Sequence, residues 1–168
     1  RATLWLGAYS RSLDIEHIES VKVINTYPQA HIEGILNGLQ GKHTYTPPLF
    51  SAKHINGKRA YQLARAGESF SLSQVQMEIY HIKLLSYCHP FVHFEVSVSE
   101  GGYVRSIGEM IAQHLGVNGA LSSLERISEG AMAVNQSEGI RILNPLDYLP
   151  YAKIKSTSLC RQDVANGK

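Results

Sequence analysis

The feature that most limits how this chain can fold is a strand pattern followed at once by a helix pattern. Apolar and polar residues alternate over 91–99, which is the period of a strand with one buried face. Gly101-Gly102 interrupts the alternation, and apolar residues over 107–115 then recur at the spacing of an amphipathic helix that ends at Gly116. This change of period predicts a mixed α and β fold.

The first half of the chain repeats the same mixture. Residues 2–8 predict one strand and residues 21–24 a second. Apolar residues over 32–39 follow helical spacing and are closed by Gly41. The alternation over 75–84 changes register part-way, as a β-bulge would cause. We therefore expect an α+β core.

Turn signals dominate the segment between these elements. A proline pair at 47–48 excludes a helix there and favours an extended run over 50–55. Asn56-Gly57 is a strong hairpin or turn signal. A short helix that ends at Gly67 is expected over 58–66.

Composition and charge narrow the class of protein. The 168 residues suit one domain, and no stretch has the roughly 18 consecutive apolar residues that a membrane span needs. Cys88 and Cys160 are far apart in the sequence, which fits neither a disulfide framework nor a zinc site with close ligand pairs. The net charge of +2 is too small for an unspecific polyanion binder. We expect a cytoplasmic protein without a membrane span.

Positive charge is concentrated in one window. No acidic residue lies between Glu33 and Glu68. Cations among aromatic rings are typical of a surface that binds a phosphate backbone, but a solvated face with its acidic partners elsewhere in the fold has the same pattern. The residues alone leave both interpretations open. The five cations of the window are Lys42, Lys53, Lys58, Arg59 and Arg65.

A second candidate site lies where the strand over 91–99 gives way to the helix. If residues 103–105 are extended, Tyr103 and Arg105 point to one face and form a site for a planar base and an anion. The alternative is a tyrosine that packs near a helix start beside a solvated arginine. The chain has neither a G-x-S-x-G elbow nor a glycine-rich phosphate loop, and His89 and His93 lack the spacing of a helical metal-binding pair.

Two long runs resemble the signatures of the bacterial TruB-type tRNA pseudouridine synthases. The run TYTPPLFSAKHINGKRAYQLARAG over 44–67 resembles Q-x-P-P-x-[FY]-S-A-x-K-x-x-G-x-x-x-Y-x-x-A-R-x-G. The run over 99–132, which contains GGYVRSI, resembles the later block G-[TS]-Y-[IV]-R-[ST]-[IL]. Leu6-Gly7 and residues 10–14 resemble the family's first strand and the turn after it. The spacing is kept, so the resemblance covers about residues 1–150.

The resemblance implies a fold and a domain organisation. The fold is a pseudouridine-synthase-like α+β fold with a mainly antiparallel sheet and flanking helices, incomplete at both ends. Residues 1–150 would be part of the catalytic domain, with 44–70 as an RNA-facing insert. Residues 151–168 would begin a C-terminal RNA-binding appendage.

The resemblance also implies a reaction, that of tRNA pseudouridine(55) synthases. They isomerise a flipped-out uridine of the tRNA T loop to pseudouridine, with no metal or organic cofactor. By this resemblance Tyr103 is a catalytic residue that stacks on the uracil, and Leu124 is an apolar wall of the same pocket. Arg105 pairs with the catalytic aspartate and keeps it ionised. The partner is the T arm of tRNA, bound by a monomer. The implied RNA-binding residues are Lys53, Lys58, Tyr61 and Arg65.

One part of the family pattern is missing. The catalytic aspartate of the family lies in a G-T-L-D-P motif, which does not occur in these residues. Asp14 aligns with the turn after the first strand, and we interpret it as structural. We expect the catalytic aspartate to lie outside this chain and the chain alone to be inactive. Two alternatives stay open: a guide-RNA-dependent pseudouridine synthase, and a non-catalytic RNA-binding or chaperone module on the same scaffold.

Overall fold

The computed structural model describes residues 1–55, 57–130 and 132–134. The chain divides into two compact units, Arg1–Glu125 and Arg126–Lys168. In the second unit the described elements are the paired strands β10 (Ser128–Glu129) and β11 (Met132–Ala133). The expected boundary between 150 and 151 lies outside the described residues.

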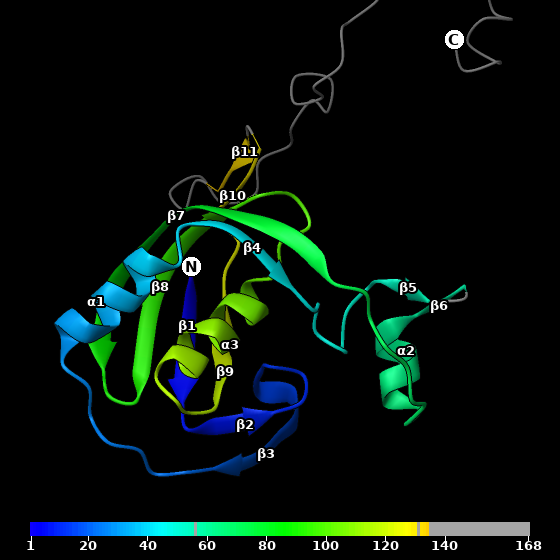
Figure 1. Ribbon diagram of the computed structural model, residues 1–168, viewed down its shortest axis with the longest axis horizontal. Coiled ribbons are helices and arrows are strands. Elements are labelled where there is room, and N and C mark those ends of the chain that lie inside the picture. The colour runs from blue at the N-terminus through cyan, green and yellow to red at the C-terminus, as the bar shows by residue number, and fades with distance from the viewer. Residues whose placement is uncertain (56, 131, 135–168) are drawn as a thin grey trace, which may run out of the picture. The chain divides into compact units, whose positions relative to one another are not determined.

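A five-stranded sheet forms the centre of the first unit (Figure 1). The strand order is β4-β7-β8-β1-β9, and every neighbouring pair is antiparallel. The expected α+β class with a mainly antiparallel sheet is therefore confirmed. The five strands are β1 (Ala2–Leu6), β4 (Gly41–Tyr45), β7 (Val75–Cys88), β8 (Phe91–Val98) and β9 (Gly119–Leu124).

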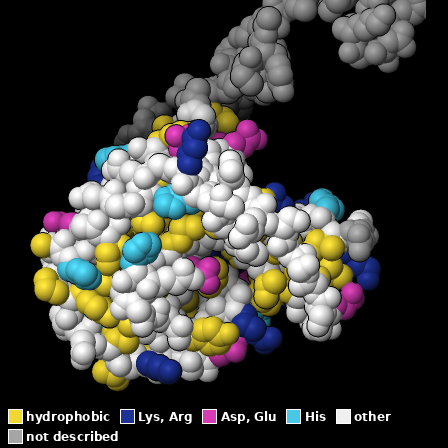
Figure 2. All heavy atoms as spheres, in the orientation of Figure 1, with side chains coloured by type: hydrophobic (Ala, Val, Ile, Leu, Met, Phe, Trp, Pro, Cys, Tyr) yellow, Lys and Arg dark blue, Asp and Glu magenta, His cyan; other side chains and the backbone are white. Residues whose placement is uncertain are grey.

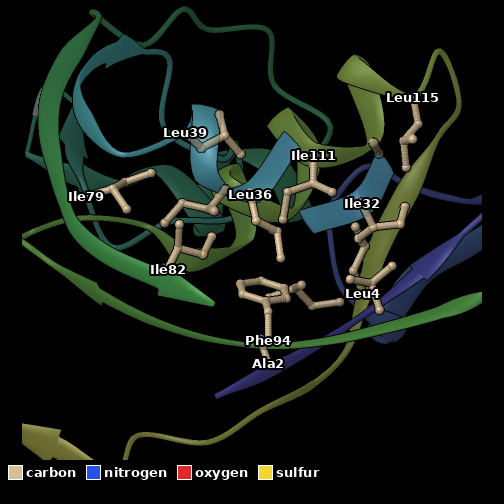
Figure 3. Close-up of a cluster of buried hydrophobic side chains, with 14 of the residues drawn as sticks. Ala2, Leu4, Ile32, Leu36, Leu39, Ile79, Ile82, Phe94, Ile111 and Leu115 are labelled. Carbon is tan, nitrogen blue, oxygen red and sulfur yellow. The ribbon is translucent and has the colours of Figure 1, made fainter. Parts of the chain in front are cut away.

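Two helices, α1 (Gln29–Gly38) and α3 (Val104–His114), pack on this sheet. Figure 3 shows Leu36 of α1 and Ile111 of α3 in one cluster with Phe94 of β8, and all three side chains are buried. Burial of such apolar side chains is the main favourable contribution to folding. The core therefore fixes the orientation of α3, the element that carries the candidate site.

Two smaller parts flank the sheet. Strands β2 (Ala8–Ser10) and β3 (Ile18–Val21) pair with each other, with the short 3₁₀ helix η1 (Ile15–His17) between them. A lobe (residues 51–67, of which 56 is not described) contains the other short elements and is set apart from the sheet in Figure 1. These elements are β5 (His54–Ile55), β6 (Lys58–Arg59) and α2 (Ala60–Arg65).

Most of the predicted elements are present. The helix over 32–39 is the core of α1, and the register of β7 shifts between Ile79 and His81, which confirms the bulge. The helix expected over 58–66 is shorter, Ala60–Arg65, because Lys58–Arg59 form strand β6. Gly67 follows its end as expected, where the amides of Gly67 and Glu68 donate to carbonyls of the last helical turn. A hairpin turn lies at Gly57, whereas Asn56 is not among the described residues.

Three further local predictions were wrong. The second strand is Ile18–Val21 rather than 21–24, because it pairs with β2 through Ala8 and Val21. Only His54–Ile55 of the expected extended run over 50–55 forms a strand. Residues 103–105 are not extended throughout, because α3 begins at Val104. Strand alternation therefore does not relate Tyr103 to Arg105.

No helix within the described ranges is long and apolar enough to cross a membrane.

We expect Gly7→Ala to destabilise the protein by at least about 2 kcal/mol, because Gly7 has both a positive φ and a close backbone neighbour. Its φ is +87°, and an added Cβ would lie 2.3 Å from the Lys22 carbonyl oxygen. Gly57 is a matched control, since its φ is +81° but nothing lies within 4 Å of an added Cβ. Urea unfolding of both alanine variants measures the difference, and equal destabilisation would show that the close approach to Lys22 does not matter.

The ion pairs of Glu95 should make the stability of the protein depend on pH. It lies between Arg1, whose Nε is 2.9 Å from Oε2, and Lys83, whose Nζ is 2.8 Å from Oε1. The hydrogen bonds from Lys83 and Arg1 lower the pKa of Glu95 from 4.5 to about 2. The stabilisation that this cluster provides is therefore complete above pH 4.5 and is lost as the pH falls towards 2.

We expect Glu95→Gln to lower the free energy of unfolding by about 1 kcal/mol at pH 7, since the two cations are well exposed to solvent. The difference between variant and wild type should shrink as the pH falls below 4.5 and vanish only below about pH 2. Denaturant unfolding at several pH values measures it. A difference that stays constant down to pH 2 would contradict the assignment of the ion pairs.

Candidate functional site

The candidate site is built around Arg105 in the first turn of α3, where the side chain is only 20% exposed. Its Nη1 donates to the Ser12 carbonyl at 2.8 Å and to Asp14 Oδ2 at 3.0 Å. Its Nη2 donates to the Phe50 carbonyl at 2.8 Å. These bonds use three of the five N–H groups of a guanidinium. Nε–H and one Nη2–H have no acceptor in the part of the chain that the structure describes.

The partner turn between β2 and η1 is tightly bonded. Asp14 Oδ1 accepts the Ser12 hydroxyl at 2.5 Å and the Glu16 amide at 3.1 Å, which leaves Oδ2 for Arg105. The Asp14 side chain thus caps η1 and binds the guanidinium at once. Leu13, between Ser12 and Asp14, has a φ of +61°, a conformation that costs a residue with a side chain on the order of 1–2 kcal/mol. This turn is strained and is held by its bonds.

Tyr103 precedes α3 as its N-cap residue and is half-buried. Its backbone N–H donates to the Tyr45 hydroxyl at 3.2 Å. Leu124 is the last residue of β9, pairs with Ala2 across β1, and is 56% exposed. The structure therefore places Tyr103 and Arg105 two residues apart at the start of α3. Among the described residues, no hydrogen bond or ion pair joins Leu124 to either of them.

The four expected RNA-binding residues all belong to the lobe. Lys53 and Lys58 are exposed, and Lys58 Nζ lies 3.5 Å from the Glu68 carboxylate. On α2 the guanidinium of Arg65 lies over the ring of Tyr61, 5.7 Å from its centroid. Arg65 also pairs with Glu16 of η1 at 3.7 Å. Two of the cations thus have acidic partners, but exposed ion pairs at these distances contribute little to stability.

A cavity of about 340 Å³ lies between the lobe and the segment that contains η1 and β3. Figure 2 shows the surface hollowed between the lobe and the main body. The rings of His17 and Phe50 are 5.7 Å apart at its wall, and Arg11 pairs with Glu19 at 2.7 Å. The cavity is therefore partly aromatic, and its cations are already balanced by carboxylates. Its lining residues are Arg11, His17, Ile18, Glu19, Phe50, Ala64 and Arg65.

Comparison with protein families identifies the chain. The model of the TruB family pseudouridylate synthases (N terminal domain) matches residues 1–104, more than half of the sequence. The chain belongs to the TruB family. The match includes Asp14, Phe50 and the lobe, while Arg105 follows directly after it.

Individual relatives of this TruB-family chain carry the name tRNA pseudouridine synthase B. The protein from Helicobacter hepaticus is 66% identical over all 168 residues, and that from Sulfurimonas denitrificans is 51% identical over 150 residues. A relative from Campylobacter jejuni is 48% identical over 150 residues, or 89% of this chain. The chain spans 59%, 55% and 55% of the lengths of these three relatives.

A solved structure, of a Cbf5-Nop10-Gar1 complex, shares the fold. One of its chains superposes with a TM-score of 0.56 at 20% sequence identity, over 81% of this chain and 31% of that one. The α+β architecture of the TruB-family chain is thus the fold found there. Sequence identity at this level indicates the fold alone.

Sequence reasoning interpreted Asp14 as structural and did not find it as the partner of Arg105. The two residues are 91 positions apart, and no local pattern links them. The only local signal was the Ser12-x-Asp14 spacing, which is typical of a side-chain-bonded turn. In the described part of the TruB-family chain no group of three or more His, Cys, Asp or Glu side chains is placed to hold a metal ion.

Proposed function

We propose that the protein containing this chain is a tRNA pseudouridine synthase, which isomerises a flipped-out uridine of the T loop. The observation that carries the proposal is the arrangement of Arg105. Three bonds fix its guanidinium between α3, the turn after β2 and the lead into the lobe. Its other two N–H groups have no acceptor among the residues that the structure describes.

The two available N–H groups suit a second carboxylate. A guanidinium binds carboxylates in a fixed fork geometry and stays charged at any working pH. A catalytic aspartate from outside this chain would accept these N–H groups and would be kept ionised by the neighbouring charge. In that form it serves as nucleophile or proton acceptor while the uracil detaches, turns and reattaches through carbon.

In the proposed mechanism Tyr103 stacks on the flipped uracil and Leu124 provides an apolar wall. Flipping is required because the glycosidic carbon is hidden while the base is stacked within the loop. An exposed leucine that closes on the base would exclude water from the reacting atoms. No metal or organic cofactor takes part in the steps proposed.

The lobe is the proposed binding surface for the T arm. Exposed Lys53, Lys58 and Arg65 would contact phosphates, and Tyr61 would present a ring beside the Arg65 guanidinium. Phosphate contacts of this kind set register and orientation rather than reading bases. The proposal also includes a monomeric state and a cytoplasmic location. It further includes a C-terminal RNA-binding appendage that begins at residue 151.

The test is pseudouridine formation by the full-length protein on unmodified tRNA. We expect Arg105→Ala to lower turnover at saturating tRNA by at least about 100-fold, while the Kd for tRNA changes by less than about 3-fold, because its role is to hold a carboxylate. Arg105→Lys should recover little turnover, since an ammonium cannot bond Asp14, two carbonyls and a second carboxylate in the same geometry.

Lys83→Ala provides the control, because Lys83 of β7 also forms an ion pair, with Glu95 of β8. It should leave turnover unchanged. Equal reductions of turnover and tRNA affinity in Arg105→Ala would make Arg105 a phosphate-binding residue instead. A wild-type protein that binds tRNA but forms no pseudouridine would favour a non-catalytic RNA-binding module.

Salt dependence tests the lobe. Neutralising Lys53, Lys58 and Arg65 to Gln should reduce the slope of log Kd against log salt concentration by about one unit for each cation that binds a phosphate in the wild type. Binding titrations of tRNA at several salt concentrations give the slope. Lys83→Gln serves as the control. An unchanged slope in the lobe variant would mean that these cations form a solvated face and not an RNA surface.

A further inference from the structure

Two tyrosine hydroxyls hold the two ends of α3. At the N-terminal end the Tyr45 hydroxyl accepts the Tyr103 N–H at 3.2 Å. At the C-terminal end the Tyr27 hydroxyl donates to the Leu115 carbonyl at 3.0 Å. Helix ends present unpaired N–H groups at the start and unpaired carbonyls at the finish. Each phenol supplies the partner that its own end of the helix lacks.

Tyr45 is well placed to fix the start of α3. It is the last residue of β4, pairs with Val75 of β7, and is only 6% exposed. Burial raises the pKa of its phenol, so the hydroxyl stays neutral. Because the ring is embedded in the core formed by the sheet and helices, its oxygen has a fixed position.

The bond acts on the residue that the proposed mechanism places against the base. Tyr103 has extended backbone angles (φ −99°, ψ 108°), and its own side chain forms no capping hydrogen bond to α3. Its carbonyl accepts the amides of Ser106 and Ile107, while its N–H is held by Tyr45. The Tyr103 peptide is therefore fixed on one side by the helix and on the other by a phenol from β4.

The segment that follows Tyr45 forms a second hydrogen bond with α3. Five residues after Tyr45, the Phe50 carbonyl accepts Arg105 Nη2. The chain over 45–50 thus contacts both Tyr103, through a side-chain oxygen, and Arg105, through a backbone oxygen. This one segment therefore contributes to the positions of both Tyr103 and Arg105.

We propose that Tyr45 is a positioning residue whose hydroxyl orients Tyr103 in the uridine pocket, so that it affects turnover and not RNA affinity. The inference rests on the proposed function above. This role differs from a general role in folding. If the Tyr45 hydroxyl only stabilised α3, its removal would have the same effect on turnover as removal of the Tyr27 hydroxyl at the other end of the helix.

The experiment compares Tyr45→Phe with Tyr27→Phe in the full-length protein. Each variant removes one hydroxyl bonded to the backbone at an end of α3, and each keeps its ring. We expect Tyr45→Phe to slow single-turnover pseudouridine formation at saturating tRNA on the order of 10-fold, because small displacements of reacting groups strongly affect rate. Its Kd for tRNA should change by less than about 2-fold. Tyr27→Phe should leave turnover and Kd within about 2-fold of wild type. The Tm should fall by a similar amount in the two variants.

A double-mutant cycle gives a second readout. If Tyr45 acts through Tyr103, Tyr45→Phe should have little further effect on turnover in a Tyr103→Ala background. Additive effects would overturn the proposal, as would a Tyr45→Phe variant with wild-type turnover or one in which mainly tRNA affinity is reduced. If the wild-type protein forms no pseudouridine, the proposed function fails and this inference fails with it. An active wild type with an unaffected Tyr45→Phe variant removes this inference alone.

Discussion

The candidate site depends on Arg105, a positively charged side chain at the N-terminal end of α3. The dipole of α3 disfavours a positive charge near its N-terminus, so Arg105 requires acceptors from elsewhere. It finds them in the Asp14 carboxylate, 91 positions away, and in the Phe50 carbonyl, 55 positions away. Because these acceptors lie in separate parts of the chain, one guanidinium determines how the turn after β2, the lead into the lobe and α3 meet.

Local patterns in the sequence were sufficient to predict most of the helices and strands of the fold. The periodicity over 32–39 and 91–99 predicted α1 and β8, since each pattern arises from one buried face. The start of α3 was missed because Gly101-Gly102 masks the point at which helical angles begin. The second strand was misplaced because its position is set by pairing with β2, an interaction that periodicity does not encode.

The candidate site was less accessible to such reasoning. Tyr103 and Arg105 stood out as a possible base and anion site, but a motif resemblance was needed to favour that interpretation. Asp14 was given only a local role, and Tyr45 was given none. Both residues act through hydrogen bonds across more than fifty positions, which a single sequence does not reveal.

The turn that binds Arg105 contains Leu13, whose backbone has a positive φ. A leucine in the left-handed region returns to ordinary angles as soon as its surroundings allow. Here the Leu13 carbonyl accepts the Leu121 amide of β9 and the flanking Ser12 carbonyl accepts Arg105, so release is blocked on both sides. The strained turn is thus held by β9 through Leu121 and by α3 through Arg105. If Arg105 were drawn away, the turn would lose the bonds that the Ser12 carbonyl and Asp14 Oδ2 accept, whereas the bonds to Leu121 and Glu16 would remain.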